Sequence, residues 1–247
     1  MKNNFYFKEP FSNIYKLPNK GSEVTSQILY GEKFKILSKR NSWIKIKSLF
    51  DNYIGFINNK KYVSELEVTH KVSNIQANIF KKPNIKTKKI LPFGSKLSVI
   101  EERNHFGKFD KNQWVKLKDI KKITHKEKNF LKIFKLFLKT KYVWGGKTNK
   151  GIDCSALLQI FFYYNNLFYP RDTRDQMKYS IKKISKKFKK GDIIFWKGHV
   201  AVCVNSKQLI HAYGPEKKVI IMPIKQTIAK ILDTANLKVK KISKVKF

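Results

Sequence analysis

Three residues of this chain have the types and spacing needed for nucleophilic catalysis at a carbonyl. Cys154 lies in the stretch Gly151-Ile-Asp-Cys-Ser155, directly before apolar residues that recur at helical spacing, so we expect it in the first turn of a helix. There the partial positive charge of the helix end and the unpaired backbone N–H groups favour the thiolate, the form that attacks carbonyls. His199 and His211 follow in segments expected to be strands. A thiol at a helix start with two histidines on nearby strands is the arrangement of a cysteine hydrolase.

The part of the chain that carries these residues is predicted to be an α+β domain. A helical pattern ends near Thr140, a second helix runs from Cys154 to about Asn165, and alternating strands follow from Ile193 onward. Helices first and an antiparallel sheet afterwards describe a papain-like plan, in which the thiol helix packs on the sheet. We therefore assign residues 126–247 to a thiol peptidase domain.

Two related β-rich segments precede that domain. Each contains short alternating strands, turns and a tryptophan, and the order of features in the first segment returns about 64 residues later. Phe93-Gly94, for example, parallels Tyr30-Gly31. Units of this size predict small SH3-like barrels. The predicted fold is thus α+β overall, with one barrel at residues 1–69, a second at residues 70–125, and the thiol peptidase domain after them.

The net charge of +37 invites a nucleic-acid hypothesis, since 54 residues are Lys or Arg and 17 are Asp or Glu. Lysine is spread over the whole chain, however, and the arginines are few: Arg40, Arg103, Arg171 and Arg174. Abundant Lys, Asn and Ile with scarce Ala is the pattern of A/T-rich codons. We therefore expect no specific nucleic-acid partner, only weak and salt-sensitive affinity for polyanions.

The sequence also gives expectations for the cellular compartment, the oligomeric state and the cofactors. No apolar run approaches the ~18 residues of a membrane span, and the first residues lack the apolar core of a signal peptide. We expect a cytoplasmic monomer without a membrane partner; a secreted or periplasmic protein is the alternative. Two cysteines without a Cys-x-x-Cys pair predict neither a disulfide scaffold nor a zinc site, so no metal or cofactor is expected. Cys203 should be a buried strand residue.

A family resemblance emerges from motifs taken in order along the chain. They are Tyr142-Val-Trp-Gly-Gly146, Gly151-Ile-Asp-Cys-Ser155, Pro170-Arg-Asp-Thr173, Lys190-Gly-Asp-Ile-Ile-Phe-Trp196, Gly198-His-Val200 and Ile210-His-Ala212. In order and spacing they resemble the NlpC-type cell-wall cysteine peptidases. Together with the two barrels, the whole chain looks like the bacterial dipeptidyl-peptidase VI group with paired bacterial SH3 domains. One departure is Ala156, where relatives usually have Gly.

The resemblance assigns roles to the residues identified above. It implies that Cys154 is the nucleophile, that His199 is the base, and that His211 orients the base. It also implies a murein peptide as substrate, cut after γ-D-glutamate by way of an acyl-enzyme. The developing oxyanion would be met by the Cys154 backbone N–H and, as the family suggests, by the hydroxyl of Tyr142.

Two neighbours of the nucleophile suggest how the substrate is selected. In the dipeptidyl-peptidase group, the residues that match Asp153 and Ser155 hold the free amine of an N-terminal L-alanine, which implies an exopeptidase acting on liberated fragments. Asp153 could equally be only the cap of the Cys154 helix. Two other residues also have a purely structural alternative. His211 could simply pack on its strand, and Tyr142 could be an ordinary core aromatic.

Arg171 and Tyr30 are further candidate substrate contacts. The planar fork of Arg171 suits a carboxylate, either that of a substrate or those of Asp172 and Asp175, and the internal pairing is the favoured interpretation. Tyr30 is a candidate because the resemblance implies that the first barrel helps to close the substrate site. The barrels could instead bind the cell wall.

These observations predict a cysteine peptidase that hydrolyses the γ-D-glutamyl–diamino-acid bond of L-Ala-γ-D-Glu-diaminopimelate peptides, in murein recycling. The alternatives are a secreted endopeptidase that cuts the intact wall and a catalytically silent wall-binding protein.

Overall fold

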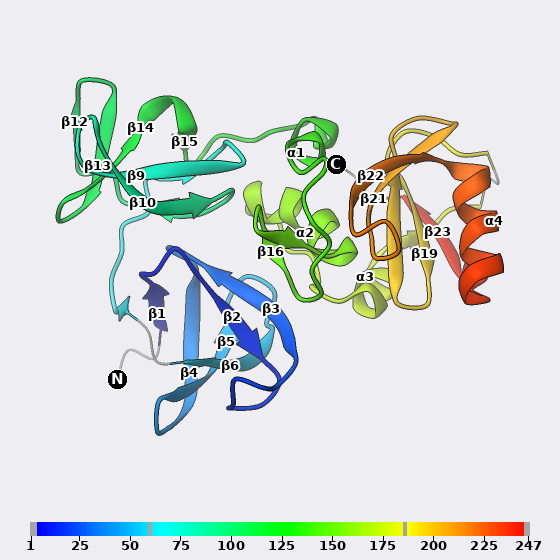
Figure 1. Ribbon diagram of the computed structural model, residues 1–247, viewed down its shortest axis with the longest axis horizontal. Coiled ribbons are helices and arrows are strands. Elements are labelled where there is room, and N and C mark those ends of the chain that lie inside the picture. The colour runs from blue at the N-terminus through cyan, green and yellow to red at the C-terminus, as the bar shows by residue number, and fades with distance from the viewer. Residues whose placement is uncertain (1–3, 59–60, 185–186, 245–247) are drawn as a thin grey trace. The chain divides into compact units, whose positions relative to one another are not determined.

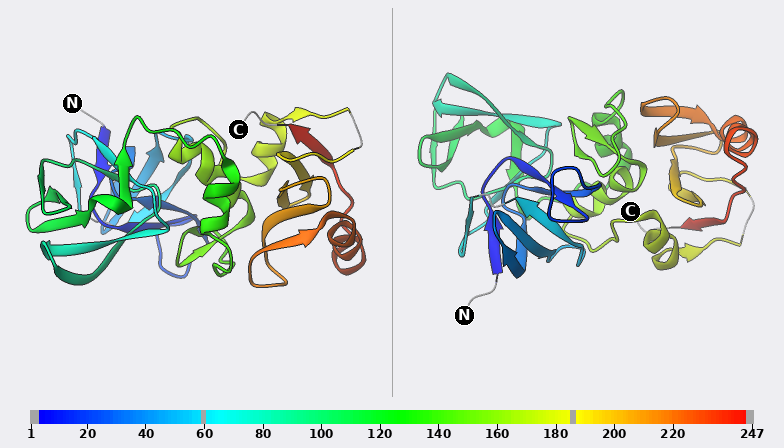
Figure 2. Two further views of the ribbon diagram at one scale, coloured as in Figure 1. Left: turned by 90° about the horizontal axis from the view of Figure 1, so that it is seen from above. Right: turned by 60° about the horizontal axis from the view of Figure 1, so that its bottom comes forward.

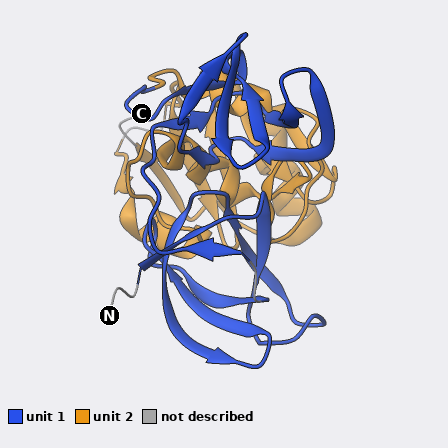
Figure 3. Ribbon diagram, turned by 90° about the vertical axis from the view of Figure 1, so that its left-hand side faces the viewer, with its two compact units in different colours: residues 1–126 blue, residues 127–247 orange. Residues whose placement is uncertain are grey.

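Strands dominate the first half of the chain, and the α-helices of the described residues all lie in the second half (Figure 1). The computed structural model describes residues 4–58, 61–184 and 187–244, so the predicted domain ends at residues 1 and 247 lie outside the described residues. The chain divides into two compact units, residues 1–126 and residues 127–247, which Figure 3 shows in separate colours. In the described ranges, no helix is both long and apolar enough to cross a membrane.

The first unit begins with a seven-stranded antiparallel sheet in the order β3-β2-β6-β5-β4-β1-β7. Its strands are β1 (Asn4–Phe7), β2 (Phe11–Tyr15), β3 (Val24–Leu29), β4 (Lys33–Arg40), β5 (Trp43–Ser48), β6 (Ile54–Asn58) and β7 (Tyr62–Val63). In β5 the buried residues alternate with more exposed ones, so that Ile44 and Ile46 point into one hydrophobic core with Phe34. This is the period-two burial expected of a half-buried strand.

The remainder of the first unit forms a five-stranded sheet, β10-β9-β14-β13-β12, and a three-stranded sheet, β11-β8-β15. The elements are β8 (His70–Val72), β9 (Gln76–Lys82), β10 (Ile85–Pro92), β11 (Lys96–Leu97), β12 (Glu101–Arg103), β13 (Phe106–Asp110), β14 (Gln113–Lys116), the 3-10 helix η1 (Leu117–Asp119) and β15 (Ile120–Lys122). Val72, Ile79 and Val115 are among the residues of its hydrophobic core.

The backbone carries the repeat that the sequence predicts. The N–H of Gly31 donates to the carbonyl of Phe7 at 2.7 Å, and the N–H of Gly94 donates to the carbonyl of Val72 at 2.9 Å. Both glycines have positive φ, 72° and 81°, a region that glycine enters without steric cost. The same turn therefore occurs at the matching place in both segments, while the number of closed barrels stays a prediction.

The second unit contains a six-stranded sheet in the order β18-β23-β19-β20-β21-β22. Its elements are α1 (Phe130–Leu136), β16 (Lys147–Thr148), β17 (Gly151–Ile152), α2 (Cys154–Tyr164), α3 (Thr173–Tyr179), β18 (Ile181–Lys182), β19 (Asp192–Trp196), β20 (His199–Cys203), β21 (Gln208–Tyr213), β22 (Lys218–Pro223), α4 (Ile224–Ala235) and β23 (Lys241–Lys244). The predicted fold class, a sheet-rich N-terminal region followed by an α+β domain, is confirmed.

Helices α2 and α4 lie on opposite sides of this sheet (Figure 1 and Figure 2). Every residue of α2 is buried, and the helix packs against β20 and β21. Helix α4 is amphipathic: Ile224 and Ile231 are buried, whereas Leu232 is exposed. Because α2 is buried on all sides, its packing holds the helix in place. Cys154 is the first residue of this helix, so its backbone is held in place as well.

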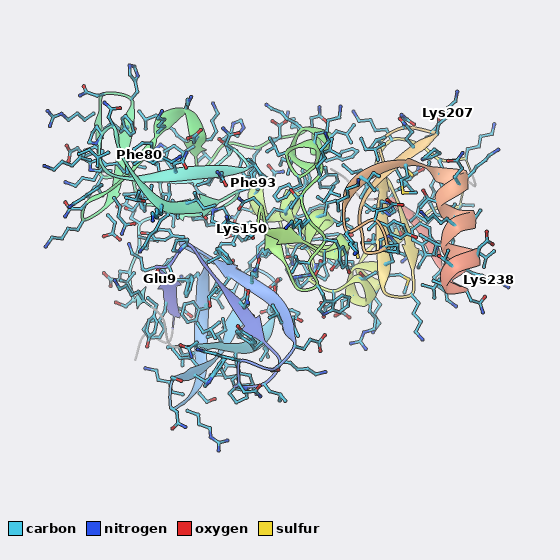
Figure 4. The ribbon with its side chains drawn as sticks, viewed as in Figure 1. Glu9, Phe80, Phe93, Lys150, Lys207 and Lys238 are labelled. Atoms are coloured by element: carbon cyan, nitrogen blue, oxygen red, sulfur yellow. The ribbon has the colours of Figure 1, made fainter. Side chains whose placement is uncertain are left out.

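Lysine side chains cover the surface of the second unit instead of gathering on one element. Figure 4 shows Lys207 and Lys238, both exposed, projecting away from the ribbon at separate places. Lys150 is also exposed, in the turn between β16 and β17.

Candidate active site

Helix α2 begins at Cys154 because Asp153 caps it. The backbone of Asp153 is extended, with φ −96° and ψ 174°, and its Oδ1 accepts a hydrogen bond from the Ala156 N–H at 2.8 Å. Cys154 is thereby the first helical residue, as predicted. In the described part of the chain, the backbone N–H of Cys154 has no acceptor. An unpaired N–H at a helix start is the type of donor that stabilises an oxyanion.

The carboxylate of Asp153 is also half of a buried ion pair. Arg171 Nη1 donates to Oδ1 at 3.0 Å, and Nη2 donates to Oδ2 at 2.6 Å. The hydroxyl of Ser155 donates to Oδ1 at 3.1 Å and accepts from Arg171 Nη1 at 2.8 Å. The N–H of Gly145 completes the set, donating to Oδ2 at 3.0 Å. The network ties the first turn of α2 to the two loops that carry Gly145 and Arg171.

This network changes the predictions for Arg171, Asp153 and Ser155. The prediction that Arg171 contacts substrate is wrong, because its side chain is only 1% exposed and is bound to Asp153. The internal pairing is present with Asp153 as the partner, and Asp175 lies 3.6 Å from Arg174. Amine binding by Asp153 and Ser155 stays a prediction, in which an ammonium would join a carboxylate whose charge Arg171 already balances.

The sulfur of Cys154 lies against the turn that leads into β20. Sγ is 4.0 Å from the carbonyl oxygen of Gly198 and 4.0 Å from Oγ1 of Thr173, and the N–H of Val200 also faces it. Gly198 and Val200 flank His199, so the nucleophile and the proposed base meet at one place in the second unit. Among the described residues, no hydrogen bond yet joins Sγ to the His199 ring. Such contacts are often long in a free enzyme and shorten when substrate binds.

The thiol of Cys154 is held in its neutral form. The residue is 5% exposed, and burial raises the pKa of the thiol to about 11, with the Asp153 carboxylate acting in the same direction. The Val200 N–H, the Thr173 hydroxyl and Arg171 lower the pKa but do not outweigh burial. Burial thus opposes the predicted resting thiolate, because loss of solvent outweighs the charge of the helix end. Attack on a carbonyl requires a base that removes the proton.

His199 and His211 form a hydrogen-bonded imidazole pair. His199 Nε2 lies 2.9 Å from His211 Nδ1, across the neighbouring strands β20 and β21. Burial lowers the pKa of His199 to about 4 and that of His211 well below its usual value, so both rings are neutral near pH 7. A neutral imidazole can accept a proton. With Nε2 engaged by His211, Nδ1 is the nitrogen of His199 left for the thiol.

Tyr142 is brought to the thiol from the loop before β16. Its hydroxyl has no hydrogen-bond partner within the described residues, and its ring lies beside Gly214. Burial raises the pKa of Tyr142, and the nearby Cys154 and Asp153 side chains act in the same direction, so the hydroxyl keeps its proton. A free, protonated hydroxyl beside the nucleophile suits the predicted oxyanion role, which stays a prediction.

Tyr30 is not available for substrate binding, which corrects the prediction made for it. Its side chain is 1% exposed and packs inside the first unit, edge-on to Phe109 with ring centroids 5.5 Å apart. Its hydroxyl donates to Asp110 at 3.3 Å, and its carbonyl accepts from the Lys96 N–H at 2.9 Å. The aromatic ring fills a hydrophobic core.

Sequence reasoning missed three residues around the imidazole pair and the thiol. Thr173 touches the sulfur, Tyr213 stacks on His211 with centroids 4.6 Å apart, and Met222 contacts the far nitrogen of His211. A signal existed for Tyr213, because residues two apart on a strand share a face. Thr173 lay inside a motif already identified, but nothing in the sequence marked Met222.

The other cysteine is separate from this site. Cys203 is fully buried in β20, carries a free thiol, and has its pKa raised to about 12 by burial. It is the buried strand residue that the sequence predicts. Within the described ranges, no three His, Cys, Asp or Glu side chains gather closely enough to hold a metal ion.

Two family models match the chain. Residues 139–235 match the NlpC/P60 family, and residues 14–61 match the bacterial dipeptidyl-peptidase Sh3 domain. The first match includes Cys154, His199 and His211, and the second lies within the seven-stranded sheet of the first unit.

Two similar proteins match most of the chain's length. Dipeptidyl-peptidase 6 of Lysinibacillus sphaericus is 26% identical over 231 residues, which span 81% of this chain and 84% of the relative. Gamma-D-glutamyl-L-lysine dipeptidyl-peptidase of Bacillus subtilis (strain 168) is 25% identical over 233 residues, 83% of this chain and 77% of the relative. A solved structure of an NlpC/P60 family protein from Bacillus cereus ATCC 10987 superimposes with a TM-score of 0.78 at 17% identity, covering 96% of this chain and 98% of that one. That similarity establishes a shared fold.

Proposed function

We propose that this chain, whose residues 139–235 match the NlpC/P60 family of cysteine peptidases, hydrolyses the γ-D-glutamyl–diamino-acid bond of peptides derived from peptidoglycan. The diamino acid is diaminopimelate, and the substrate is the free peptide L-Ala-γ-D-Glu-diaminopimelate released during murein recycling. The observation that carries the proposal is the meeting of a helix-start thiol with a paired imidazole, Cys154 beside the residues that flank His199.

In the proposed reaction, Nδ1 of His199 takes the proton of the Cys154 thiol as Sγ attacks the γ-carbonyl carbon of the D-glutamyl residue. Because the resting thiol is neutral and has a pKa of about 11, proton transfer accompanies attack instead of preceding it. The carbonyl oxygen becomes negative and is met by the Cys154 N–H and the Tyr142 hydroxyl. Each such donor is worth about 3 kcal/mol in the transition state.

The second half of the reaction uses the same groups. The imidazolium of His199 protonates the leaving amine of the diamino acid, and the acyl group remains on sulfur as a thioester. Water then attacks this thioester, with His199 again the base, and releases L-Ala-D-Glu. His211 remains hydrogen-bonded to Nε2 of His199 throughout, which keeps Nδ1 directed at the sulfur.

The names of the relatives support the choice of a γ-D-glutamyl–diamino-acid bond, and diaminopimelate as the diamino acid is our proposal. The Bacillus subtilis relative is named for the bond between γ-D-glutamate and L-lysine, a diamino acid, and the Lysinibacillus sphaericus relative is also named a dipeptidyl-peptidase. A dipeptidyl-peptidase must recognise a free amine two residues before the cut. In the proposal, that amine lies near Asp153 and Ser155 at the start of α2.

An endopeptidase that cuts longer or blocked peptides is a second candidate, and one observation favours it. Both oxygens of Asp153 already accept charge-assisted hydrogen bonds from Arg171. A carboxylate so neutralised holds an added ammonium less strongly than a free one would. The amine would then contribute little to binding.

Hydrolysis of defined peptides tests both candidates. L-Ala-γ-D-Glu-diaminopimelate and its L-lysine counterpart would be incubated with wild type, Cys154→Ala and the matched control Cys203→Ala, and release of L-Ala-D-Glu would be followed by mass spectrometry. We expect cleavage by wild type and by Cys203→Ala only. Unchanged cleavage by Cys154→Ala would overturn the assignment of the nucleophile. N-acetylation of the peptide should abolish cleavage by an exopeptidase and leave an endopeptidase unaffected.

A further inference from the structure

We propose that Met222 is a positioning residue that sets the tautomer of His211 and thereby leaves His199 able to act as the base. The inference rests on the proposed role of the imidazole pair. It concerns the far side of the second histidine, where the neighbouring group is a thioether.

The strand register brings the thioether to the ring. Strands β21 and β22 are antiparallel, and His211 is paired with Ile220. Met222 lies two residues further along β22 on the same face, a diagonal neighbour of His211. Its Sδ is 3.3 Å from Nε2 of His211.

The chemistry of sulfur decides where the proton of His211 lies. A thioether has lone pairs but no hydrogen, so it can only accept a hydrogen bond. If Nε2 of His211 were unprotonated, its lone pair would face the lone pairs of Sδ, in a position where the ring is only 1% exposed. A buried polar atom left without a partner is unfavourable. Nε2 therefore carries the hydrogen and donates it to Met222.

The proton on His211 fixes the proton on His199. A neutral imidazole has one N–H, so Nδ1 of His211 is an acceptor when Nε2 is protonated. Its partner at 2.9 Å is Nε2 of His199, which must then be the donor. Nδ1 of His199 is left with a free lone pair, as a general base requires. The opposite tautomer of His211 would reverse the hydrogen bond and protonate Nδ1 of His199, and that ring could not accept the thiol proton.

The neighbouring groups hold the rings in place without providing another way to set the proton. Tyr213 stacks on His211 at an interplanar angle of 10°, and Trp196 lies 5.5 Å from the His199 ring. The charged group that faces the pair is Lys230, which lies over the Tyr213 ring and lowers the pKa of His211. Lys230 is itself bonded to Glu216 at 2.8 Å. Stacking fixes the plane of the ring, whereas Met222 is the one residue among those described that contacts its far nitrogen.

Nitrogen NMR of the histidine rings tests the inference on the full chain, without any substrate. Wild type labelled with nitrogen-15 in histidine should show His211 as the Nε2–H form and His199 as the Nε2–H form near pH 7. Finding His211 protonated on Nδ1 in wild type would overturn the proposal, whether or not any variant folds. The tautomer measured in this way does not depend on the proposed substrate. Failure to cleave murein peptides would therefore count against the proposed function alone.

Met222→Leu removes the acceptor while keeping an apolar side chain of similar volume. Losing a partner for a buried N–H should raise the share of the opposite tautomer on the order of tenfold, visible as a shift of both histidines in the same spectra. The rate at which iodoacetamide alkylates Cys154 at pH 7 should fall severalfold. Met177→Leu, the same change in α3, is the matched control and should leave the spectra and the rate unchanged. A Met222→Leu protein with wild-type spectra would overturn the proposal.

Discussion

Asp153 and Arg171 form a bidentate ion pair directly beside the nucleophile, with Nη2 only 2.6 Å from Oδ2. The same carboxylate caps α2, so one side chain starts the helix, anchors a distant loop and sets the charge next to Cys154. Arg171 is thus part of the framework of the site. This relationship makes stability and thiol chemistry depend on one pair of residues, and the two effects can be separated by substitution.

Arg171→Lys should strongly destabilise the protein, although it preserves the charge. Lysine cannot make two parallel hydrogen bonds to Asp153 and one to Ser155, so polar groups that are now buried and paired would lose partners. Breaking a buried pair typically costs about 3 to 5 kcal/mol, to be measured by urea unfolding. Arg174→Lys is the control, because Arg174 is exposed and its contact with Asp175 should contribute less than about 1 kcal/mol. Equal effects of the two substitutions would show that the buried pair contributes no special stability.

Asp153→Asn should lower the pKa of the Cys154 thiol below its present value of about 11. The carboxylate is one of the causes that raise this pKa, whereas Arg171 lowers it and would remain. The measurement is the rate of iodoacetamide alkylation as a function of pH, whose midpoint should move to lower pH. Asp175→Asn, at an exposed position, should leave the midpoint unchanged. A midpoint that stays fixed or rises in Asp153→Asn would contradict the electrostatic account.

Patterns that are local in the sequence predicted much of the second unit. Alternation located β19 to β22, and helical spacing after Asp153 placed the start of α2 at Cys154. Helix α3 was not predicted: it is only seven residues long and mostly polar, so it lacks an apolar period that could reveal it. Strand and helix patterns show which residues close in sequence share a face of an element. The predictions made from them were accurate for elements long enough to repeat the pattern.

The charges at the site could not be predicted, because they depend on contacts between distant segments. Asp172 and Asp175 are near Arg171 in the sequence, yet folding pairs Arg171 with Asp153, a residue on another element. A helix start predicted a thiolate at Cys154, but burial reversed the outcome. Burial likewise removed Tyr30 from the list of substrate contacts. In the last two cases solvent exposure decided the result, and exposure is not visible in a local motif.

The imidazole pair should make the protein less stable as the pH falls below about 6.5. Burial lowers the pKa of His199 and His211 in the folded state, so the unfolded chain binds more protons between about pH 6.5 and pH 4. The free energy of unfolding therefore decreases through this range as acid is added, and it is unaffected by these groups above it. His211→Asn should flatten the dependence between pH 6.5 and pH 5, measured by urea unfolding, whereas His105→Asn at an exposed turn should not. A steeper slope in His211→Asn would contradict the sign.

Tyr142→Phe should impair catalysis without impairing folding. In the described residues the hydroxyl has no hydrogen-bond partner, so its removal leaves no buried group unpaired, and the ring can still lie beside Gly214. If the hydroxyl stabilises the oxyanion, kcat should fall by roughly 100-fold to 1000-fold with KM little changed, because the interaction forms only in the transition state. Tyr179→Phe, at an exposed position, is the matched control and should keep wild-type kinetics. A rise in KM at constant kcat would instead assign Tyr142 to substrate binding, and an unchanged kcat/KM would remove it from the site.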